Sequence, residues 1–246
     1  MTLAEILHSS SALFLDFDGT RVDIAPQPQA VHVPEPFLGV LQDLHQYLHG
    51  AVAVISGRPL AQIDAFLYPL HLPVAGVHGA ERRSDDGQVH LLDTHPLDHV
   101  EAVAVALAAD HPGLLVENKR GSVALHYRQR PELEDLCLGA MQQAVDESPG
   151  LTLQRGKMVA EAKPGGASKG RAIEEFLAEP PFTGRTPVFI GDDVTDEAGF
   201  STVQRLGGIG IKVGEGATVA SRHLPDPAAL RRELAAAVPA RPTRTE

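Results

Sequence analysis

Residues 12–20 read Ala-Leu-Phe-Leu-Asp-Phe-Asp-Gly-Thr, and this stretch decides the fold. Its first six residues are apolar except for Asp16, which predicts a short strand covered on both faces. The sequence Asp18-Gly19-Thr20 that follows predicts a turn. A strand of this kind belongs in a parallel sheet with helices on both sides, and it brings Asp16 and Asp18 to the point where it ends.

The segments on either side of a central region alternate between helix and strand patterns. After the first strand, the predicted elements are a helix at 37–48, a strand at 51–55, a helix at 59–67 and a strand at 73–77. The pattern returns near the end of the chain, with a helix at 172–177 and strands at 187–190 and 209–213. This alternation predicts an α/β fold: a Rossmann-like core with a parallel sheet and right-handed crossovers.

The central region has a different pattern, beginning after about Pro96. Helices are predicted at 97–109 and 131–147, and short strands at 114–117, 122–128, 151–154 and 158–163. Short alternating strands beside helices indicate an α+β unit with an antiparallel sheet. We therefore expect core segments at 1–96 and 165–246, with a cap domain at 97–164 inserted between them. Residues 239–246 are expected to form a frayed tail.

Composition and charge exclude several classes of partner. The net charge of −11 over 246 residues repels nucleic acid and anionic membranes, and aromatic residues make up only 4% of the chain. The single cysteine, Cys137, lies on the apolar stripe of its predicted helix, which indicates a core residue. No apolar run is long enough to span a bilayer, and the N-terminus lacks a basic signal-peptide region. We expect a cytoplasmic protein without an obligate protein partner.

Acidic residues follow the predicted strands of the core. Asp16 and Asp18 end the first strand, and Asp192, Asp193 and Asp196 follow the strand at 187–190. In an open parallel sheet, ligands bind beyond the carboxyl ends of the strands. Carboxylates gathered there repel one another unless a cation lies between them, and Mg²⁺ prefers oxygen ligands and leaves positions open for a phosphate. The alternative is that these aspartates only cap turns and helices.

Two segments resemble a nucleotide-binding loop and a calcium-binding loop, but neither fits the full motif. The sequence Gly165-Gly166-Ala167-Ser168-Lys169-Gly170 resembles a nucleotide-binding P-loop, but Gly170 precedes Arg171 where that motif needs a lysine, so ATP is not indicated. Asp16-Phe17-Asp18-Gly19 is too short for a calcium loop.

Four motifs occur in an order that identifies a family. Asp16-Phe17-Asp18-Gly19-Thr20 resembles the D-x-D-G-T signature of the haloacid dehalogenase superfamily of phosphatases. Three further segments resemble the superfamily's other motifs and occur in the same order. They are Ser56-Gly57-Arg58, Ser168-Lys169-Gly170 and residues 191–197, Gly-Asp-Asp-Val-Thr-Asp-Glu. Among the branches, the combination is most similar to the trehalose-6-phosphate phosphatases, through the segments 76–81 and 117–119. Arg21 departs from the pattern, because the residue after the D-x-D-G-T signature is usually apolar.

The resemblance implies roles for these residues. Asp16 is the nucleophile that attacks phosphorus, and Asp18 is first a general acid and then a general base. Ser56 and Lys169 hold the phosphoryl group, with Gly19, Thr20 and Gly57 beside it. Mg²⁺ is bound by Asp16, the backbone carbonyl of Asp18 and Asp192, supplemented by Asp193 and Asp196. The alternatives are a helix cap for Ser56 and a solvated charge for Lys169.

The predicted cap strands carry three pairs of charged or histidine residues, and the two members of each pair are two positions apart. Both members of a pair therefore lie on the same face of their strand. The opposite face is apolar, with Val123, Leu125 and Tyr127. A face with carboxylates and cations suits a polyhydroxy ligand, although an ordinary solvated face has the same pattern. The candidate sugar-binding residues on the cap are Glu117, Lys119, His126, Arg128, Glu161 and Lys163. The core-side candidates are Arg58, Glu81 and His78, for which a structural turn is the alternative.

The expected reaction is Mg²⁺-dependent hydrolysis of trehalose 6-phosphate, a small-molecule partner, through an aspartyl phosphate. Three alternatives remain open: a phosphatase for another sugar phosphate, such as sucrose phosphate or a mannosyl phosphoglycerate; a phosphomutase or phosphotransferase with the same nucleophile; and a sugar-phosphate sensor without activity.

Overall fold

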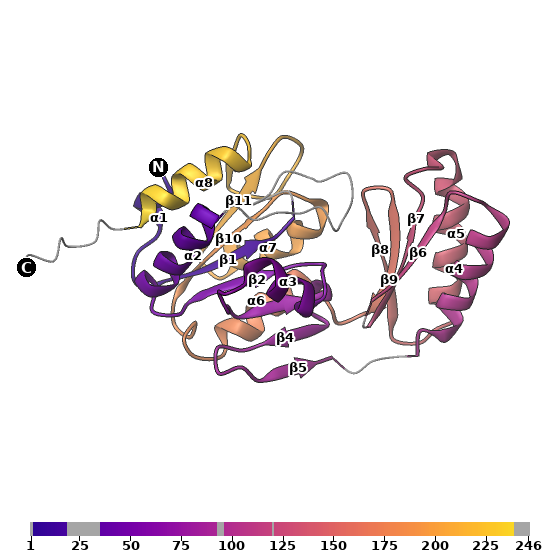
Figure 1. Cartoon of the computed structure of the whole chain (residues 1–246), viewed down its shortest axis with the longest axis horizontal. Helices are drawn as coiled ribbons and strands as arrows, with labels where there is room; N and C mark the ends of the chain where they lie inside the picture. Colours follow the sequence, from indigo (N-terminus) through magenta and orange to yellow (C-terminus); the bar gives the residue numbers. More distant parts are fainter. Residues whose placement is uncertain (1, 19–34, 93–95, 120, 239–246) are drawn as a thin grey trace, which may run out of the picture.

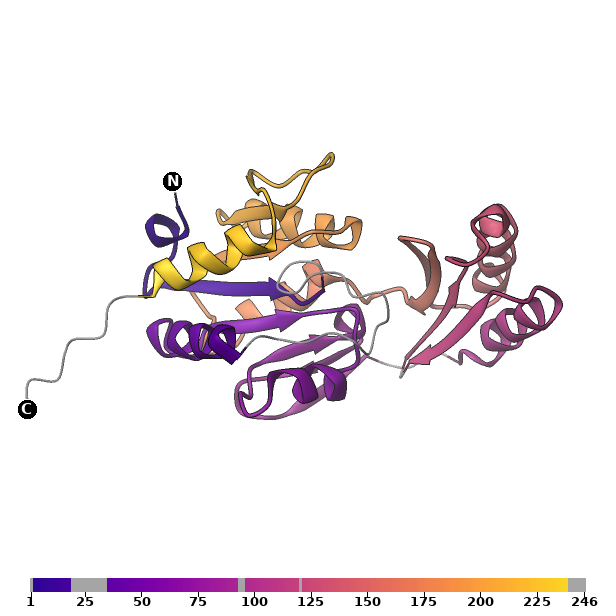
Figure 2. The same cartoon turned by 45° about the horizontal axis from the view of Figure 1, so that its top comes forward.

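The computed structural model describes residues 2–18, 35–92, 96–119 and 121–238, and it shows two lobes (Figures 1 and 2). The larger lobe is built on an eight-stranded sheet in the order β12-β11-β10-β1-β2-β3-β4-β5. The six strands from β12 to β3 run parallel, and β4 and β5 extend the sheet antiparallel. Its strands are β1 (Ser11–Asp16), β2 (Val52–Ile55), β3 (Val74–Gly76), β4 (Glu81–Arg83), β5 (Val89–Leu91), β10 (Thr186–Gly191), β11 (Ile209–Val213) and β12 (Arg222–Leu224).

Helices cover both faces of this sheet. The right-handed crossovers place α2 and α3 on one face, where α8 packs against α1 and α2, and place α6 and α7 together on the other. Every residue of β1 is buried, as the apolar run at 12–17 predicts. The bounds are α1 (Leu3–Ile6), α2 (Glu35–Tyr47), α3 (Leu60–Leu67), α6 (Lys169–Leu177), α7 (Glu197–Arg205) and α8 (Pro227–Ala237).

The smaller lobe is a four-stranded antiparallel sheet in the order β6-β7-β9-β8, with two helices on its outer face (Figure 1). Val123, Leu125 and Tyr127 are buried against these helices, together with Cys137, which is a core residue as expected. Its elements are α4 (Asp98–Asp110), β6 (Leu115–Lys119), β7 (Ser122–His126), the 3-10 helix η3 (Pro131–Leu133), α5 (Glu134–Asp146), β8 (Leu151–Gly156) and β9 (Val159–Pro164).

The sequence patterns did not predict β4, β5 or β12. The reason is clearest for β4, which reads Glu-Arg-Arg and has none of the apolar alternation of a strand. Arg82 is nevertheless buried, because its guanidinium donates to Glu175 and Glu179 on and after α6 and lies over the ring of Phe176. Ion pairing therefore stabilises a strand that hydrophobicity does not reveal.

Some predicted features lie outside the described residues. They are Gly19, Thr20, Arg21, the side chain of Lys119 and the expected tail at 239–246. Within the described ranges, each helix is too short or too polar to cross a membrane.

Candidate active site

The site forms where the strand order of the large sheet reverses. From β1 the chain continues to β2 on one side, whereas β10 lies on the other side. Asp16 is the last residue of β1, and Asp192 directly follows β10. Neighbouring parallel strands end at the same edge, so this topology brings two predicted carboxylates together, at the position where open α/β sheets bind ligands.

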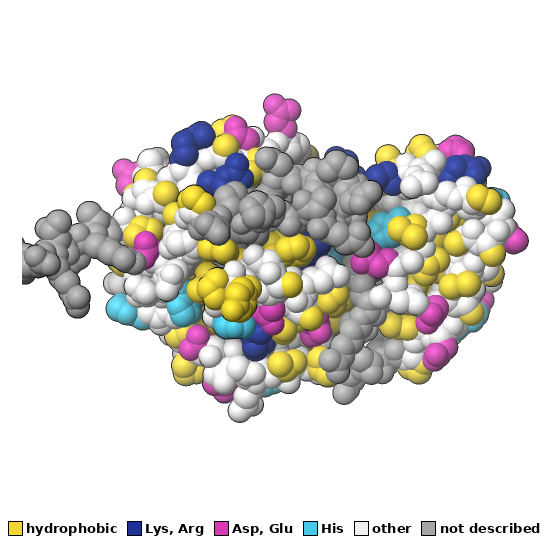
Figure 3. Space-filling model, viewed as in Figure 1, with side chains coloured by type: hydrophobic (Ala, Val, Ile, Leu, Met, Phe, Trp, Pro, Cys, Tyr) yellow, Lys and Arg dark blue, Asp and Glu magenta, His cyan; other side chains and the backbone are white. Residues whose placement is uncertain are grey.

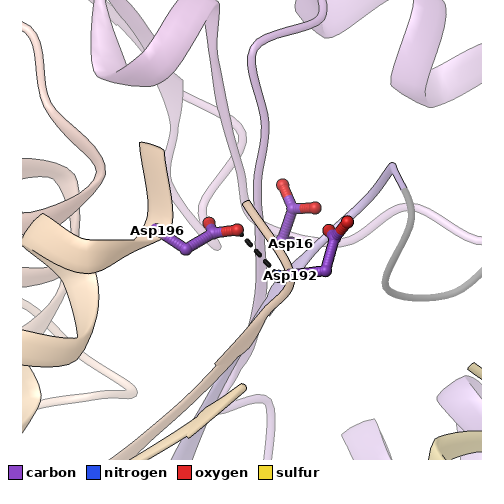
Figure 4. Close-up of side chains that lie close together, drawn as sticks. All are labelled: Asp16, Asp192 and Asp196. Carbon is purple, nitrogen blue, oxygen red and sulfur yellow. Dashed lines mark hydrogen bonds between the residues drawn. The ribbon is translucent and has the colours of Figure 1, made fainter. Parts of the chain in front are cut away.

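Three carboxylates meet at this edge (Figure 4). Asp16, Asp192 and Asp196 each offer an oxygen, and these oxygens all lie within 4.8 Å of one another. Asp196 belongs to the 3-10 helix η4 (Val194–Asp196), which turns its side chain back towards the strand. Such a set of hard oxygen donors fits a divalent cation such as Mg²⁺ or Ca²⁺.

Lys169, at the start of α6, is the cationic partner of this cluster. Its ammonium donates to Asp16 Oδ1 and to Asp196 Oδ1, each at 2.6 Å. The other oxygen of Asp196 accepts from the backbone N–H groups of residues 192 and 193, each at 2.9 Å. Asp196 is fully buried, and it connects Lys169 to the loop that carries Asp192.

Burial and crowding change the ionisation of this cluster. Burial raises the pKa of Asp16 well above its usual value, and the carboxylates of Asp196 and Asp192 add to that effect while Lys169 opposes it. Burial alone would lower the pKa of Lys169, but Asp16 and Asp196 outweigh burial and raise it, so the amine stays charged. A divalent cation among these groups would favour the ionised form of Asp16.

Gly191 allows Asp196 to approach the sheet this closely. A Cβ atom at this glycine would lie 2.3 Å from Asp196 Cγ, a separation that atoms in proteins do not adopt. Below the loop, Lys212 on β11 is buried and donates to the backbone carbonyl of Asp192 at 2.6 Å. The position of Asp192 is therefore fixed from both sides.

The loop after β2 brings Ser56, Gly57 and Arg58 to the same edge. Ser56 Oγ is buried and accepts from the backbone N–H of Arg58 at 3.1 Å, so it closes a turn in this loop and does not cap a helix, since the N-cap residue of α3 is Pro59. Arg58 forms a bidentate ion pair with Asp18, with its Nε atom 2.7 Å from Oδ2 and its Nη2 atom 2.5 Å from Oδ1. Its guanidinium also lies 5.2 Å from the ring centre of Phe66 on α3.

His78 extends from the core lobe to the cap sheet. It lies in a short 3-10 segment, η2 (Val77–Gly79), where both Val77 and His78 have positive φ, at 47° and 55°. Such a backbone costs about 1–3 kcal/mol per residue and is a marked outlier for a β-branched valine. Hydrogen bonds hold it in place, because the N–H groups of Val77 and His78 donate to the carbonyls of Arg58 and Ser56.

The polar face of the cap sheet is directed at the core. The strand register aligns Glu117 with Ala124, Ala124 with Glu161, and Glu161 with Gln154, so these residues form one row across the sheet. Directly paired residues share a face, and the apolar residues between them pack against α4 and α5. His126 Nε2 lies 2.9 Å from Glu117, and Ser122 Oγ donates to Glu161 at 2.6 Å.

A cavity of about 300 Å³ separates the two lobes, and charged and histidine side chains gather at this junction on the surface (Figure 3). Most of the predicted site residues line it. They are Asp16, Asp18, Gly57, Arg58, His78, Glu117, His126, Arg128, Glu161, Lys169, Asp192 and Asp193.

Four predicted residues with described side chains lie behind this lining or away from it. Ser56 and Asp196 are buried beneath it, and Lys163 donates to Gln154. Glu81 accepts from the backbone N–H of Leu60 at 2.5 Å, so it caps α3. Asp193 lines the cavity, but its carboxylate caps η4 and lies outside the three-carboxylate cluster.

Sequence reasoning missed several residues that line the cavity, namely Pro59, Gln62, Gln154, Gly156, Lys157, Val159 and Thr195. Gln154 had a visible signal, because Thr152 and Gln154 alternate with Leu151 and Leu153 along β8. Lys157 lies in the turn between β8 and β9, where periodicity carries no information.

Comparison with known proteins agrees with this geometry. Residues 14–230 match the family described as Trehalose-phosphatase. The chain is 47% identical to a trehalose-6-phosphate phosphatase of Escherichia coli K12 over 221 residues, covering 89% of this chain and 83% of that protein.

Solved structures share the fold. The C-terminal domain of the Candida albicans trehalose-6-phosphate phosphatase superposes with a TM-score of 0.84 at 21% identity, covering 93% of this chain and 92% of that one. A haloacid dehalogenase-like hydrolase from B. subtilis gives a TM-score of 0.68 at 13% identity, covering 91% and 99%. The α/β fold with its parallel sheet is thus the haloacid dehalogenase fold, and by sequence the chain belongs to the trehalose-phosphatase family.

Proposed function

We propose that this protein hydrolyses trehalose 6-phosphate to trehalose and phosphate through an aspartyl phosphate on Asp16. The observation that carries the proposal is the meeting of Asp16, Asp192, Asp196 and Lys169 at one sheet edge, below a cavity roofed by a polar cap face. Membership of the family supports the substrate, and the acidic and basic groups of the cavity suit sugar hydroxyls, which both donate and accept.

The reaction proceeds in two displacements on phosphorus. A carboxylate oxygen of Asp16 attacks the phosphorus atom, the bond from phosphorus to the sugar oxygen breaks, and Asp18 gives its proton to that oxygen. Water then attacks the aspartyl phosphate, Asp18 takes up the proton, and phosphate leaves with Asp16 regenerated. Lys169 offsets negative charge on the phosphoryl group, and Ser56 shapes the loop beside it.

Mg²⁺ is the cation that fits this donor set best. Asp16 and Asp192, with the backbone carbonyl of Asp18, would hold it, while Asp196 and Asp193 orient or supplement these ligands. When bound, it would polarise the phosphoryl group and screen the anionic nucleophile from an anionic substrate.

The cap sheet would bind the sugar. We assign this task to Glu117, Lys119, His126, Arg128, Glu161 and Lys163, with Arg58 from the core and Gly19, Thr20 and Gly57 beside the phosphate, and His78 would act on the sugar through its contact with the cap. Glu81 would act indirectly, through α3. The cap would comprise residues 97–164, and the core residues 1–96 and 165–246. The cytoplasmic location stays a prediction.

A panel of sugar phosphates, assayed for phosphate release with and without a chelator, tests the proposal. Trehalose 6-phosphate is expected to be the preferred substrate, and the chelator to abolish release. A preference for sucrose phosphate or a mannosyl phosphoglycerate would refute the substrate. Transfer of phosphate to a second sugar with little free phosphate would indicate a phosphotransferase, and binding without turnover in excess Mg²⁺ would indicate a sensor.

A further inference from the structure

The positive-φ turn at Val77 and His78 carries a core side chain to the cap. His78 Nε2 lies 3.2 Å from Gln154 Nε2 on β8 and 3.5 Å from Glu161 Oε2 on β9. The turn's two N–H groups are held by the carbonyls of Ser56 and Arg58, in the loop beside the phosphate site. A rigid path therefore runs from that loop, through His78, to the sugar-facing row of the cap.

Hydrogen-bond chemistry fixes how His78 and Gln154 meet. The ammonium of Lys163 can only donate, so the atom of the Gln154 amide that it contacts is the oxygen. The amide nitrogen of Gln154 consequently faces His78 and donates to Nε2, which makes Nε2 an acceptor and leaves the imidazole neutral.

Burial agrees with the neutral form. His78 is 7% exposed, and its Nδ1 atom is buried without a hydrogen-bond partner among the described residues. Burial lowers the pKa of His78, and Glu161 only partly opposes this effect. His78 therefore carries two energetic costs, an unsatisfied buried Nδ1 atom and a positive-φ backbone, beside the contact that its Nε2 atom makes.

Gly57 leaves the space that this contact needs. A Cβ atom at Gly57 would lie 2.6 Å from His78 Nε2, so any other residue there would displace the ring from Gln154. Gln154 pairs with Glu161 in the strand register, and Glu161 is held from its other side by the hydroxyl of Ser122. Gln154 and His78 thus flank the carboxylate of Glu161.

We propose that His78 and Gln154 form a latch between core and cap, which holds the cap closed and positions Glu161 for the sugar. The proposal rests on the proposed function for the nature of the ligand, but the contact itself lies within the protein. His78 and Gln154 are positioning residues, and the latch would favour large sugar phosphates that span both lobes over small phosphate esters that need only the core.

The test uses His78→Asn, Gln154→Ala and the double variant. Asparagine tolerates positive φ but is too short to reach Gln154, so the turn is expected to fold. The kcat/KM for trehalose 6-phosphate should fall about five- to hundredfold in each single variant, whereas that for p-nitrophenyl phosphate should stay within about threefold. The double variant should lose little more than either single one, because both remove the same contact. His99→Asn and Gln142→Ala, on the outer side of the cap, are matched controls expected to behave as wild type.

Small-angle scattering without substrate provides a second readout. Loss of the latch should increase the radius of gyration of both single variants, and the two controls should leave it unchanged. Any of three results would overturn the latch. They are an unchanged radius of gyration in the single variants, equal losses of kcat/KM on the two substrates, and losses that multiply in the double variant. If the wild-type protein prefers another sugar phosphate, the proposed substrate fails, and the same ratio measured with that compound still judges the latch.

Discussion

Asp16, the proposed nucleophile, could attack phosphorus only while it is ionised, and its surroundings oppose ionisation unless positive charge is supplied. It is 3% exposed, and two further carboxylates lie close to it. Lys169 supplies one positive charge but shares it with Asp196. This conflict at the scale of one residue explains why the proposed site would need a divalent cation in addition to the buried lysine.

Replacing Asp16 tests its proposed role directly. Asp16→Asn should lower phosphate release by at least about a thousandfold, because the amide cannot form the aspartyl phosphate. The circular dichroism spectrum should be unchanged, since asparagine has the same shape. Asp110→Asn, at the exposed end of α4, should retain full activity. An active Asp16→Asn protein would remove the mechanism.

The buried His78 predicts a pH dependence of stability. Its pKa in the folded protein lies below the ordinary value, so the unfolded chain binds a proton first as the pH falls. The free energy of unfolding should therefore decrease below about pH 6.5. Urea unfolding at pH 5 and pH 7 should show a smaller decrease in His78→Asn than in the wild type; equal decreases would contradict a neutral buried imidazole.

At the scale of elements, the close approach of a side chain to the backbone decides the geometry of the loop at 191–196, which connects β10 to α7. Gly191 ends β10 where Asp196 folds back from η4. The strand predictions at 12–17 and 187–190 were confirmed because buried parallel strands are continuous apolar runs. The roles of Asp193 and Asp196 could not be separated in this way, because both follow the strand and only the turn of η4 decides which one faces Asp16.

Gly191→Ala should disrupt this loop. The added Cβ would displace Asp196, and with it the contacts to Lys169 and to the N–H groups of residues 192 and 193, so a loss of about 2–4 kcal/mol in the free energy of unfolding is expected. Gly139→Ala, inside α5, is the matched control. Nothing lies within 4 Å of its Cβ position, so this variant should be more stable by about 0.5–1 kcal/mol. Denaturant unfolding measures both, and equal stability changes would show that the close approach is not tight.

At the scale of the whole molecule, the two lobes contribute different groups to the cavity. The core holds the carboxylate cluster proposed to react with phosphorus, and the cap contributes a polar sheet face. Periodicity predicted that face from the pairs at 117 and 119, 126 and 128, and 161 and 163, but it could not show that β8 adds Gln154 or that His78 reaches the cap. Both facts depend on strand pairing and on a positive-φ turn, which residue patterns do not encode.

This division predicts a selective effect of cap substitutions. Glu117→Ala should reduce kcat/KM for trehalose 6-phosphate about tenfold or more, while a small aryl phosphate should be hydrolysed within about threefold of the wild-type rate. Glu132→Ala, an exposed acidic position elsewhere on the cap, should affect neither substrate. Parallel losses on both substrates would show that the cap does not select the sugar.

Metal removal should be visible in stability as well as in activity. A ligand that binds only the folded state stabilises it by about 2.7 kcal/mol at one hundred times its dissociation constant. Protein treated with a chelator should therefore unfold at a lower temperature than protein in excess Mg²⁺. The difference should shrink in Asp192→Asn, and a wild-type protein indifferent to Mg²⁺ would contradict the assignment of the cation.

The row formed by Glu117, Ala124, Glu161 and Gln154 has an evolutionary consequence. Alternate residues of these strands have two different roles. One set packs in the interior of the cap, and the other set lies on the face proposed to bind the sugar. A point substitution in the row can therefore alter which sugar is accepted without loosening the domain that carries it. A single-residue insertion in β9 would do the reverse, because it would exchange the two sets and bury charge against α5. We therefore expect substrate preference in such domains to change by substitutions in the row, and not by insertions that change the length of a strand.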